Sequence, residues 1–195
     1  MRSLVASFAA LALAVPAAAR AQPVSTMGGA GPDTYLELHL GAFVPQSSDL
    51  DALDPNVDLG LTFGARFTQN LSAEIETGYY RASATESSGV KGVMDAIPIV
   101  ASLRFRYPLK VAELSAFGGG GIHFAHTSTS GLGAFDSSAS DTAFGYHLGG
   151  EAAFMLSPTM RVGFEVRRTF VNASFDGADT DIGGLRLAAT LGYHF

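Results

Sequence analysis

Most of this chain alternates apolar and polar residues with a period of two. The clearest example places Leu36, Leu38 and Leu40 on one side and Glu37 and His39 on the other. A strand points successive side chains to opposite faces, whereas a helix would scatter the three leucines round its surface. The same period recurs in eight segments, which are residues 35–44, 57–67, 71–80, 97–107, 114–124, 144–154, 160–167 and 184–195. The pattern therefore predicts eight strands.

The connections between these segments alternate between long and short. The long ones are residues 45–56, 82–94, 126–140 and 171–181, and the short ones are residues 68–70, 108–112 and 155–159. The short ones carry turn residues, and the long ones are rich in Ser, Asp, Thr and Gly, so we expect the long loops to be mobile. Alternation of long and short connections is typical of extracellular loops and periplasmic turns. We expect an all-β fold, an eight-stranded antiparallel up-and-down transmembrane β-barrel, over residues 34–195.

Composition supports a barrel over other membrane or soluble classes. Of the 195 residues, 47% are hydrophobic and only 15% are charged, against about 25% charged in an ordinary soluble domain. No apolar run of membrane-spanning length follows the N-terminal segment, which argues against transmembrane helices in the mature protein. The absence of cysteine excludes disulfides and thiolate metal sites. A net charge of −6 disfavours nucleic acid as a partner.

The N-terminal segment has the features of an export signal. Arg2 precedes the apolar stretch 4–15, and Ala19-Arg20-Ala21 forms a small-x-small cleavage site. A membrane anchor is the alternative, but the apolar core is too short for one. We therefore predict a signal peptide over residues 1–21 and a flexible periplasmic lead over residues 22–33. Cleavage leaves ten basic residues against eighteen acidic ones, a mature net charge of −8.

A soluble β-sandwich or lipocalin-like barrel would alternate in the same way. Three features favour a barrel in lipid: the polar face holds Gly, Ser and paired charges, aromatic residues collect near the segment ends, and the sequence closes on an aromatic residue. The aromatic residues near one set of ends are Phe67, Phe105, Tyr107, Phe154, Tyr193 and Phe195, and those near the other are Tyr79, Phe124, Phe144 and Phe170. Such girdles are expected at the two membrane interfaces.

The C-terminal sequence LGYHF, the opening YLELHLGAFVP and the later VRRTF resemble the small outer-membrane β-barrel proteins of Gram-negative bacteria, the family that includes the outer-membrane protein A barrel. The resemblance covers about residues 35–195. It implies location in the cell outer membrane and a free-standing barrel without a periplasmic peptidoglycan-binding domain. It also implies that Leu191, Tyr193 and Phe195 form an assembly signal, which the outer-membrane barrel insertion machinery reads.

The inward-facing row of the predicted barrel is charged. Its basic members are Arg66, Arg104, Arg106, Arg161, Arg167 and Arg186, and its acidic members are Glu37, Asp58, Glu74, Glu76, Glu151 and Glu165. The interior of an eight-stranded barrel is only wide enough for side chains, so charges there must pair. An ion pathway is one interpretation and a structural plug is the other. We favour the plug, with Arg66 and Arg104 flanking Glu74.

Two arginines, Arg81 and Arg168, break the outward apolar pattern near the outer strand ends. They either snorkel into the headgroup layer or contact lipopolysaccharide phosphates. Acidic residues cluster in the long loops, at Asp49, Asp51, Asp54, Asp176, Asp179 and Asp181. Carboxylates suit Ca²⁺ or Mg²⁺, but neither stretch follows the order of a calcium-binding loop, so we interpret them as a solvated acidic surface and predict no metal site.

Three function classes remain. We favour a structural or interaction protein with mobile acidic surface loops, partnered by outer-membrane lipid and lipopolysaccharide and acting as a monomer without a cofactor. A narrow channel for small or apolar solutes, as in the outer-membrane protein W family, is the alternative. An enzyme is disfavoured: the lipid A deacylase family carries a His-x-Ser-Asn-Ala run, and the comparable residues 169–173 here read Thr-Phe-Val-Asn-Ala, without base or nucleophile. His126-Thr127-Ser128 has the His-x-Ser spacing but lacks the following Asn-Ala.

Overall fold

The computed structural model describes residues 33–46, 54–85, 91–131, 137–175 and 178–195. The predicted signal peptide and all but Asp33 of the predicted periplasmic lead lie outside this range. Nine strands run along the described chain: β1 (Asp33–Pro45), β2 (Asp54–Arg66), β3 (Leu71–Thr85), β4 (Lys91–Pro108), β5 (Ala112–Ser130), β6 (Ser137–Met155), β7 (Met160–Phe175), β8 (Ala178–Asp181) and β9 (Gly184–His194). None of the described residues forms a helix long and apolar enough to cross a membrane.

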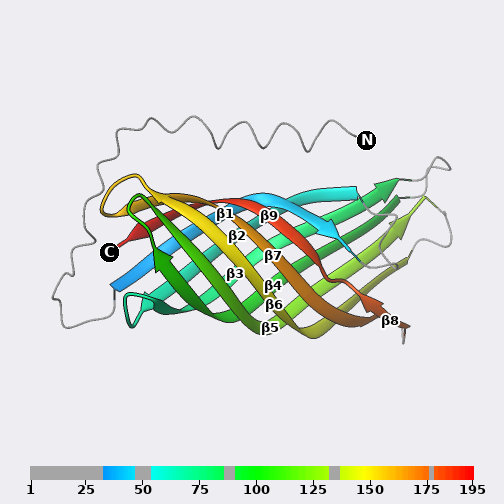
Figure 1. Ribbon diagram of the computed structural model, residues 1–195. Helices are drawn as coiled ribbons and strands as arrows, with labels where there is room; N and C mark the ends of the chain where they lie inside the picture. The colour runs from blue at the N-terminus through cyan, green and yellow to red at the C-terminus, as the bar shows by residue number, and fades with distance from the viewer. Residues whose placement is uncertain (1–32, 47–53, 86–90, 132–136, 176–177) are drawn as a thin grey trace.

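The strands close into a barrel with eight antiparallel strand positions around the ring, which we call staves. This confirms the predicted fold class. Strands β1 to β7 pair in sequence order, β7 also pairs with β9, and β1 pairs with β9 to close the ring. β8 and β9 together form the eighth stave, because the pair Asn172↔Asp181 continues the register of Thr169↔Gly184 against β7. Figure 1 shows the strands tilted relative to the long axis of the barrel, with the start of β1 and the C-terminus at the same end.

The register fixes how far the strands are sheared. A line of paired residues that starts at Tyr35 on β1 and crosses every stave once returns to β1 at Pro45, ten residues further along. Such a stagger tilts the strands and brings residues far apart in sequence to the same depth in the lumen. The β3–β4 ladder is interrupted between Thr77↔Ile99 and Tyr80↔Ala96, where Pro98 has no N–H to donate.

Several strands extend further at their extracellular ends than the hydrophobic alternation predicted. β3 reaches Thr85, β4 starts at Lys91, β5 reaches Ser130 and β6 starts at Ser137. Much of the predicted loops 82–94, 126–140 and 171–181 is therefore paired strand. Outside the bilayer a strand needs no apolar face, so the ladder continues through Ser-, Thr- and Asp-rich sequence that carries no period-two signal.

The outer wall is apolar and the inside is polar. Outward residues of the middle staves stay exposed, such as Leu38 at 56%, Ile75 at 61% and Phe105 at 55%. A belt of large exposed apolar side chains is what a lipid-facing surface requires, and it would be a liability in water. The polar side chains between them fill the lumen, where the site described next is formed.

Candidate functional site: the charged lumen

The structure places the predicted network residues inside the barrel. Buried members are Glu37, Glu74, Glu76, Arg104, Arg106, Glu151, Arg161, Glu165, Arg167 and Arg186, together with Asp58. Arg66 lies nearer the periplasmic mouth, with 14% of its side chain exposed. Six arginines thus share the lumen with seven carboxylates, of which the seventh is Glu113. The period of two explains this placement, because every charged residue has the parity of the inward row.

The layer nearest the periplasm centres on Glu113. Its Oε1 accepts hydrogen bonds from Arg106 Nη1 at 2.8 Å and from Arg161 Nη1 at 2.9 Å. Arg66 lies 3.7 Å from Glu113 Oε2 and 3.7 Å from Asp33. The prediction that Arg66 flanks Glu74 is therefore wrong. The side chain of Arg106 takes that place at 3.3 Å. On the β2 side, the Tyr35 ring lies over Gly64 and its hydroxyl donates to Glu74, so Tyr35 occupies the space that Arg66 would need.

Arg104 is the hub of the next layer. Its guanidinium donates to Glu74 Oε1 at 2.5 Å and to Glu151, and its Nη2 lies 3.6 Å from Glu37 and 3.8 Å from Glu165. The Arg104 side chain is 0% exposed, and its charged carbon lies 4.4 Å from the centre of the Phe117 ring. One planar cation thus faces four carboxylates, a geometry that the fork of arginine donors allows.

A third layer lies towards the extracellular side. Glu76 accepts from Arg167 at 2.5 Å and 2.8 Å and from Arg186 Nη1 at 2.6 Å. Arg186 also donates to Asp58 at 2.6 Å. Arg186 is shared by Glu76 and Asp58, and Arg167 forms a two-pronged pair with Glu76, so the charges are desolvated but compensated.

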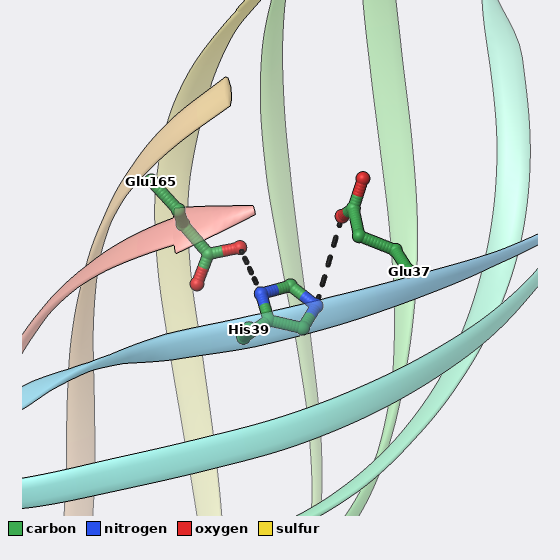
Figure 2. A group of neighbouring side chains, drawn as sticks. All are labelled: Glu37, His39 and Glu165. Atoms are coloured by element: carbon green, nitrogen blue, oxygen red, sulfur yellow. Dashed lines mark ion pairs between the residues drawn. The ribbon is translucent and has the colours of Figure 1, made fainter. Parts of the chain in front are cut away.

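Glu37, His39 and Glu165 are the three side chains that come close enough to hold a metal ion, among the residues the structure describes. Figure 2 shows the imidazole between the two carboxylates, which approach opposite ring nitrogens. Glu37 Oε1 lies 3.6 Å from His39 Nε2, and Glu165 Oε2 lies 3.5 Å from His39 Nδ1. A chelated ion would need both carboxylates on the same side of the ring as one nitrogen, and Arg104 already faces both. The arrangement fits an imidazole packed between two carboxylates that share Arg104 better than a metal site.

A small cavity lies between the third charged layer, which contributes Glu76 and Arg186 to its lining, and the residues nearer the extracellular end. The space is about 20 Å³ and is lined in part by Tyr80, His123, His147, Arg167 and Thr169. That volume has room for about one water molecule. His123 Nδ1 lies 3.2 Å from the Tyr80 hydroxyl, and His147 Nε2 lies 2.8 Å from Ser102 Oγ.

Apolar side chains cluster towards the extracellular end of the lumen. The cluster, which we call the apolar cap, consists of Phe43, Tyr80, Ala82, Met94, Ala96, Ala125, Ala143, Val171, Ala173 and Ile182. The rings of Phe43 and Tyr80 stack at 4.3 Å between centroids.

Sequence reasoning missed two parts of this interior. Glu113 lies just before the predicted fifth segment, which begins at Leu114, although its parity places it in the inward row. The apolar cap was missed because its residues fall at or beyond the ends of the predicted segments, as Met94 and Ile182 do. In both cases extending the parity of each segment by a few residues would have found them.

The two outward arginines have different surroundings. The Arg81 Nε lies 3.4 Å from Asp95 Oδ1, and the Tyr79 hydroxyl donates to the same oxygen. Arg168 instead donates to Gln46 Oε1 at 2.6 Å and lies over the Phe170 ring at 5.1 Å. Within the described part of the chain, no carboxylate forms an ion pair with Arg168.

His126 has the His-x-Ser spacing of a base and nucleophile with Ser128. In the structure its Nδ1 lies 2.9 Å from Ser140 Oγ on the neighbouring strand. Asp95 is the residue opposite His126 on the other side, but Arg81 and the Tyr79 hydroxyl engage its Oδ1. The described residues therefore show a Ser–His hydrogen bond at this place, without a carboxylate that orients the ring.

The acidic clusters divide between strand and undescribed chain. Asp54 starts β2, while Asp179 and Asp181 belong to β8, so the prediction that these three lie in loops is wrong. The hairpin of β7 and β8 continues the barrel ladder and takes in both β8 residues. Asp49, Asp51 and Asp176 lie outside the described residues.

Comparison with known proteins agrees with this architecture. A family model described as the outer membrane protein beta-barrel domain matches residues 5–195. Among curated proteins none matches the chain. Similar solved structures include Neisserial surface protein A (NspA), with 15% identity, a TM-score of 0.58, and coverage of 83% of this chain and 97% of that one. OprG from Pseudomonas aeruginosa has 16% identity and a TM-score of 0.55, covering 85% of this chain and 96% of that one. A major outer membrane protein from Thermus thermophilus has 12% identity and a TM-score of 0.58, covering 85% of this chain and 100% of that one. At these identities the likeness concerns the fold.

Proposed function

Because the chain belongs to the outer membrane protein β-barrel family and is an outer-membrane protein, we propose that it is a structural or interaction protein with a closed lumen. It has no catalytic role in this proposal. It stands as a monomer among outer-membrane lipid and lipopolysaccharide, and its acidic extracellular surface meets its partners. The observation that carries the proposal is the stack of ion-paired layers beneath an apolar cap.

The layers block the lumen in two physically different ways. The arginines and carboxylates fill the cross-section with side chains that are bonded to one another, so an ion would have to break charge-assisted hydrogen bonds to pass. The apolar cap offers a permeant ion no polar partner to replace its water. The space between them, about 20 Å³, is too small for a hydrated ion.

The test is conductance of the refolded full chain in a planar lipid bilayer. We expect no steady conductance from the wild-type protein. We also expect none from a Phe43→Ala, Met94→Ala double variant, because the charged layers remain when the cap is thinned. A stable wild-type pore of sizeable conductance would overturn the closed barrel and establish the narrow-channel alternative. Steady conductance in the double variant alone would show that the cap, and not the ion-paired stack, closes the lumen.

We also propose that Leu191, Tyr193 and Phe195 form the strip that the barrel insertion machinery reads. The three side chains point outward on one stave, with exposures of 44%, 48% and 67%, and the rings of Tyr193 and Phe195 pack edge to face. An exposed apolar and aromatic strip is available to a partner protein before the lipid covers it.

Phe195→Ser should lower the amount of folded protein in the outer membrane several-fold. His194→Ser is the matched control, since His194 is buried in the lumen beside Asp33 and should have a milder effect on insertion. Quantitative blotting of membrane fractions from cells that express each variant measures the difference. An equal loss for both variants would remove the support for a recognised outward strip.

A further inference from the structure

The outward face of β7 carries a cation, Arg168, without a carboxylate partner among the described residues. Arg168 projects outward from β7, and the residues paired with it on the neighbouring strands are Leu148 and Leu185. Leu148 is 55% exposed on the same apolar wall. A guanidinium on such a surface needs hydrogen-bond acceptors and a counter-charge, because hydrocarbon supplies neither.

The protein supplies part of this need and directs the group towards the extracellular rim. Gln46 follows the last residue of β1, and it accepts from Arg168 Nη1 through Oε1 at 2.6 Å and from Nη2 through its backbone oxygen at 3.4 Å. The guanidinium lies 5.1 Å from the centre of the Phe170 ring, which stacks on Tyr146 at 4.8 Å. The side chain is thus held in one orientation at the level of the interfacial aromatic residues.

We propose that Arg168 binds a phosphate group of an outer-leaflet lipid, with Gln46, Phe170 and Tyr146 holding the guanidinium in place. Arginine has five N–H donors, and two of them are used on Gln46. The remaining donors form a planar edge that matches phosphate oxygens. The acyl chains of the same lipid pack against the flanking leucines, Leu148 and Leu185, and against the two aromatic rings.

The proposal separates the two outward arginines. Arg81 has its charge compensated by Asp95 at 3.4 Å, so it needs no anion from the membrane. Arg168 lacks such a partner in the part of the chain that the structure describes. This inference rests on the outer-membrane placement of the barrel, but it does not depend on whether the lumen is closed.

The experiment measures how lipid A raises the thermal unfolding midpoint of the full chain in detergent. Each protein is titrated with bisphosphorylated lipid A, with lipid A lacking both phosphates, and with inorganic phosphate. We expect the bisphosphorylated form to bind the wild-type protein about ten-fold more tightly than the dephosphorylated form, as loss of one charge-assisted hydrogen bond predicts. Inorganic phosphate alone should give no shift, because the site includes the apolar wall.

Three variants distinguish an anion-binding role of Arg168 from a purely structural role of its hydrogen bonds to Gln46. Arg168→Gln should lose the ten-fold preference, while Arg81→Gln should keep it. Gln46→Ala removes the side-chain hydrogen bond to Arg168 but leaves the Arg168 charge. It should therefore lower the thermal unfolding midpoint without lipid and still show most of the preference for bisphosphorylated lipid A. The proposal is overturned if Arg168→Gln keeps the preference or if Arg81→Gln loses it equally. A shift with inorganic phosphate equal to that with lipid A would also overturn it, because the lipid would then be irrelevant. Conductance of Arg168→Gln should equal that of the wild type, so this test and the pore test fail independently.

Discussion

Arg104→Ala should lower the free energy of unfolding by about 3–5 kcal/mol, the range for breaking one side of a buried ion pair. The side chain is 0% exposed and lies within 4 Å of Glu37, Glu74, Glu151 and Glu165. Its removal leaves four carboxylates facing one another in a poorly hydrated interior, where like charges repel strongly. Urea titration of the protein in lipid vesicles, followed by the mobility difference between folded and unfolded protein on an unheated gel, measures the change.

Arg66→Ala is the matched control. Arg66 is also a lumen arginine with two carboxylate partners, but both lie at 3.7 Å and its side chain reaches the periplasmic mouth. Its removal should cost less than about 1 kcal/mol, because water can solvate what remains. A combined Arg104→Met, Glu74→Gln, Glu151→Gln variant should be more stable than Arg104→Ala, since it removes charge from both sides of the network. Equal losses for Arg104→Ala and Arg66→Ala would contradict the hub assignment.

Gly119→Ala should prevent most of the protein from folding. A Cβ at Gly119 would lie 1.9 Å from the Ala101 carbonyl oxygen and 2.7 Å from the Ser102 Cα on the neighbouring strand β4. Both are backbone atoms that cannot turn away, so the two strands would have to separate. We expect a cost of about 3 kcal/mol or more, at the upper end of overpacking effects.

The same glycine run supplies the control. Gly118 points to the other side of the wall, and a Cβ there would lie 3.4 Å from its nearest neighbour, the His147 carbonyl oxygen. Gly118→Ala should therefore change the free energy of unfolding by less than about 1 kcal/mol, and alanine would reduce the freedom of the unfolded chain. The folded fraction after refolding into vesicles compares the two variants. Similar folding yields would show that the β4–β5 contact is looser than the structure indicates.

Much of this protein could be predicted from local sequence pattern. Alternation assigned each residue to the inside or the outside, as Glu37 and His39 against Leu36 and Leu38 illustrate, and loop lengths established an even number of up-and-down strands. Both properties depend on neighbours within one strand, where the side-chain period is two. Burial of the arginines and glutamates of the inward row followed from the same parity. The extent of the strands above the membrane could not follow from it, since no apolar face is required there.

Which charges meet was decided only by the tertiary structure. The depth of each side chain depends on register summed over eight staves, and a displacement of one pair of residues on one strand moves every contact across the lumen. Hence Arg104 contacts Glu151 on β6 as well as Glu74 on β3, and Tyr35 of β1, which lies over Gly64, leaves Arg106 rather than Arg66 to pair with Glu74. The same summed register carries the extracellular ends of six strands to one level, where Met94 and Ile182 close the cap, and lays Gln46 of β1's extracellular end beside Arg168 of β7. Whether a residue faces the lumen or the outside depends on its own strand alone. The shear is a property of the closed ring, and no single segment of the sequence encodes it.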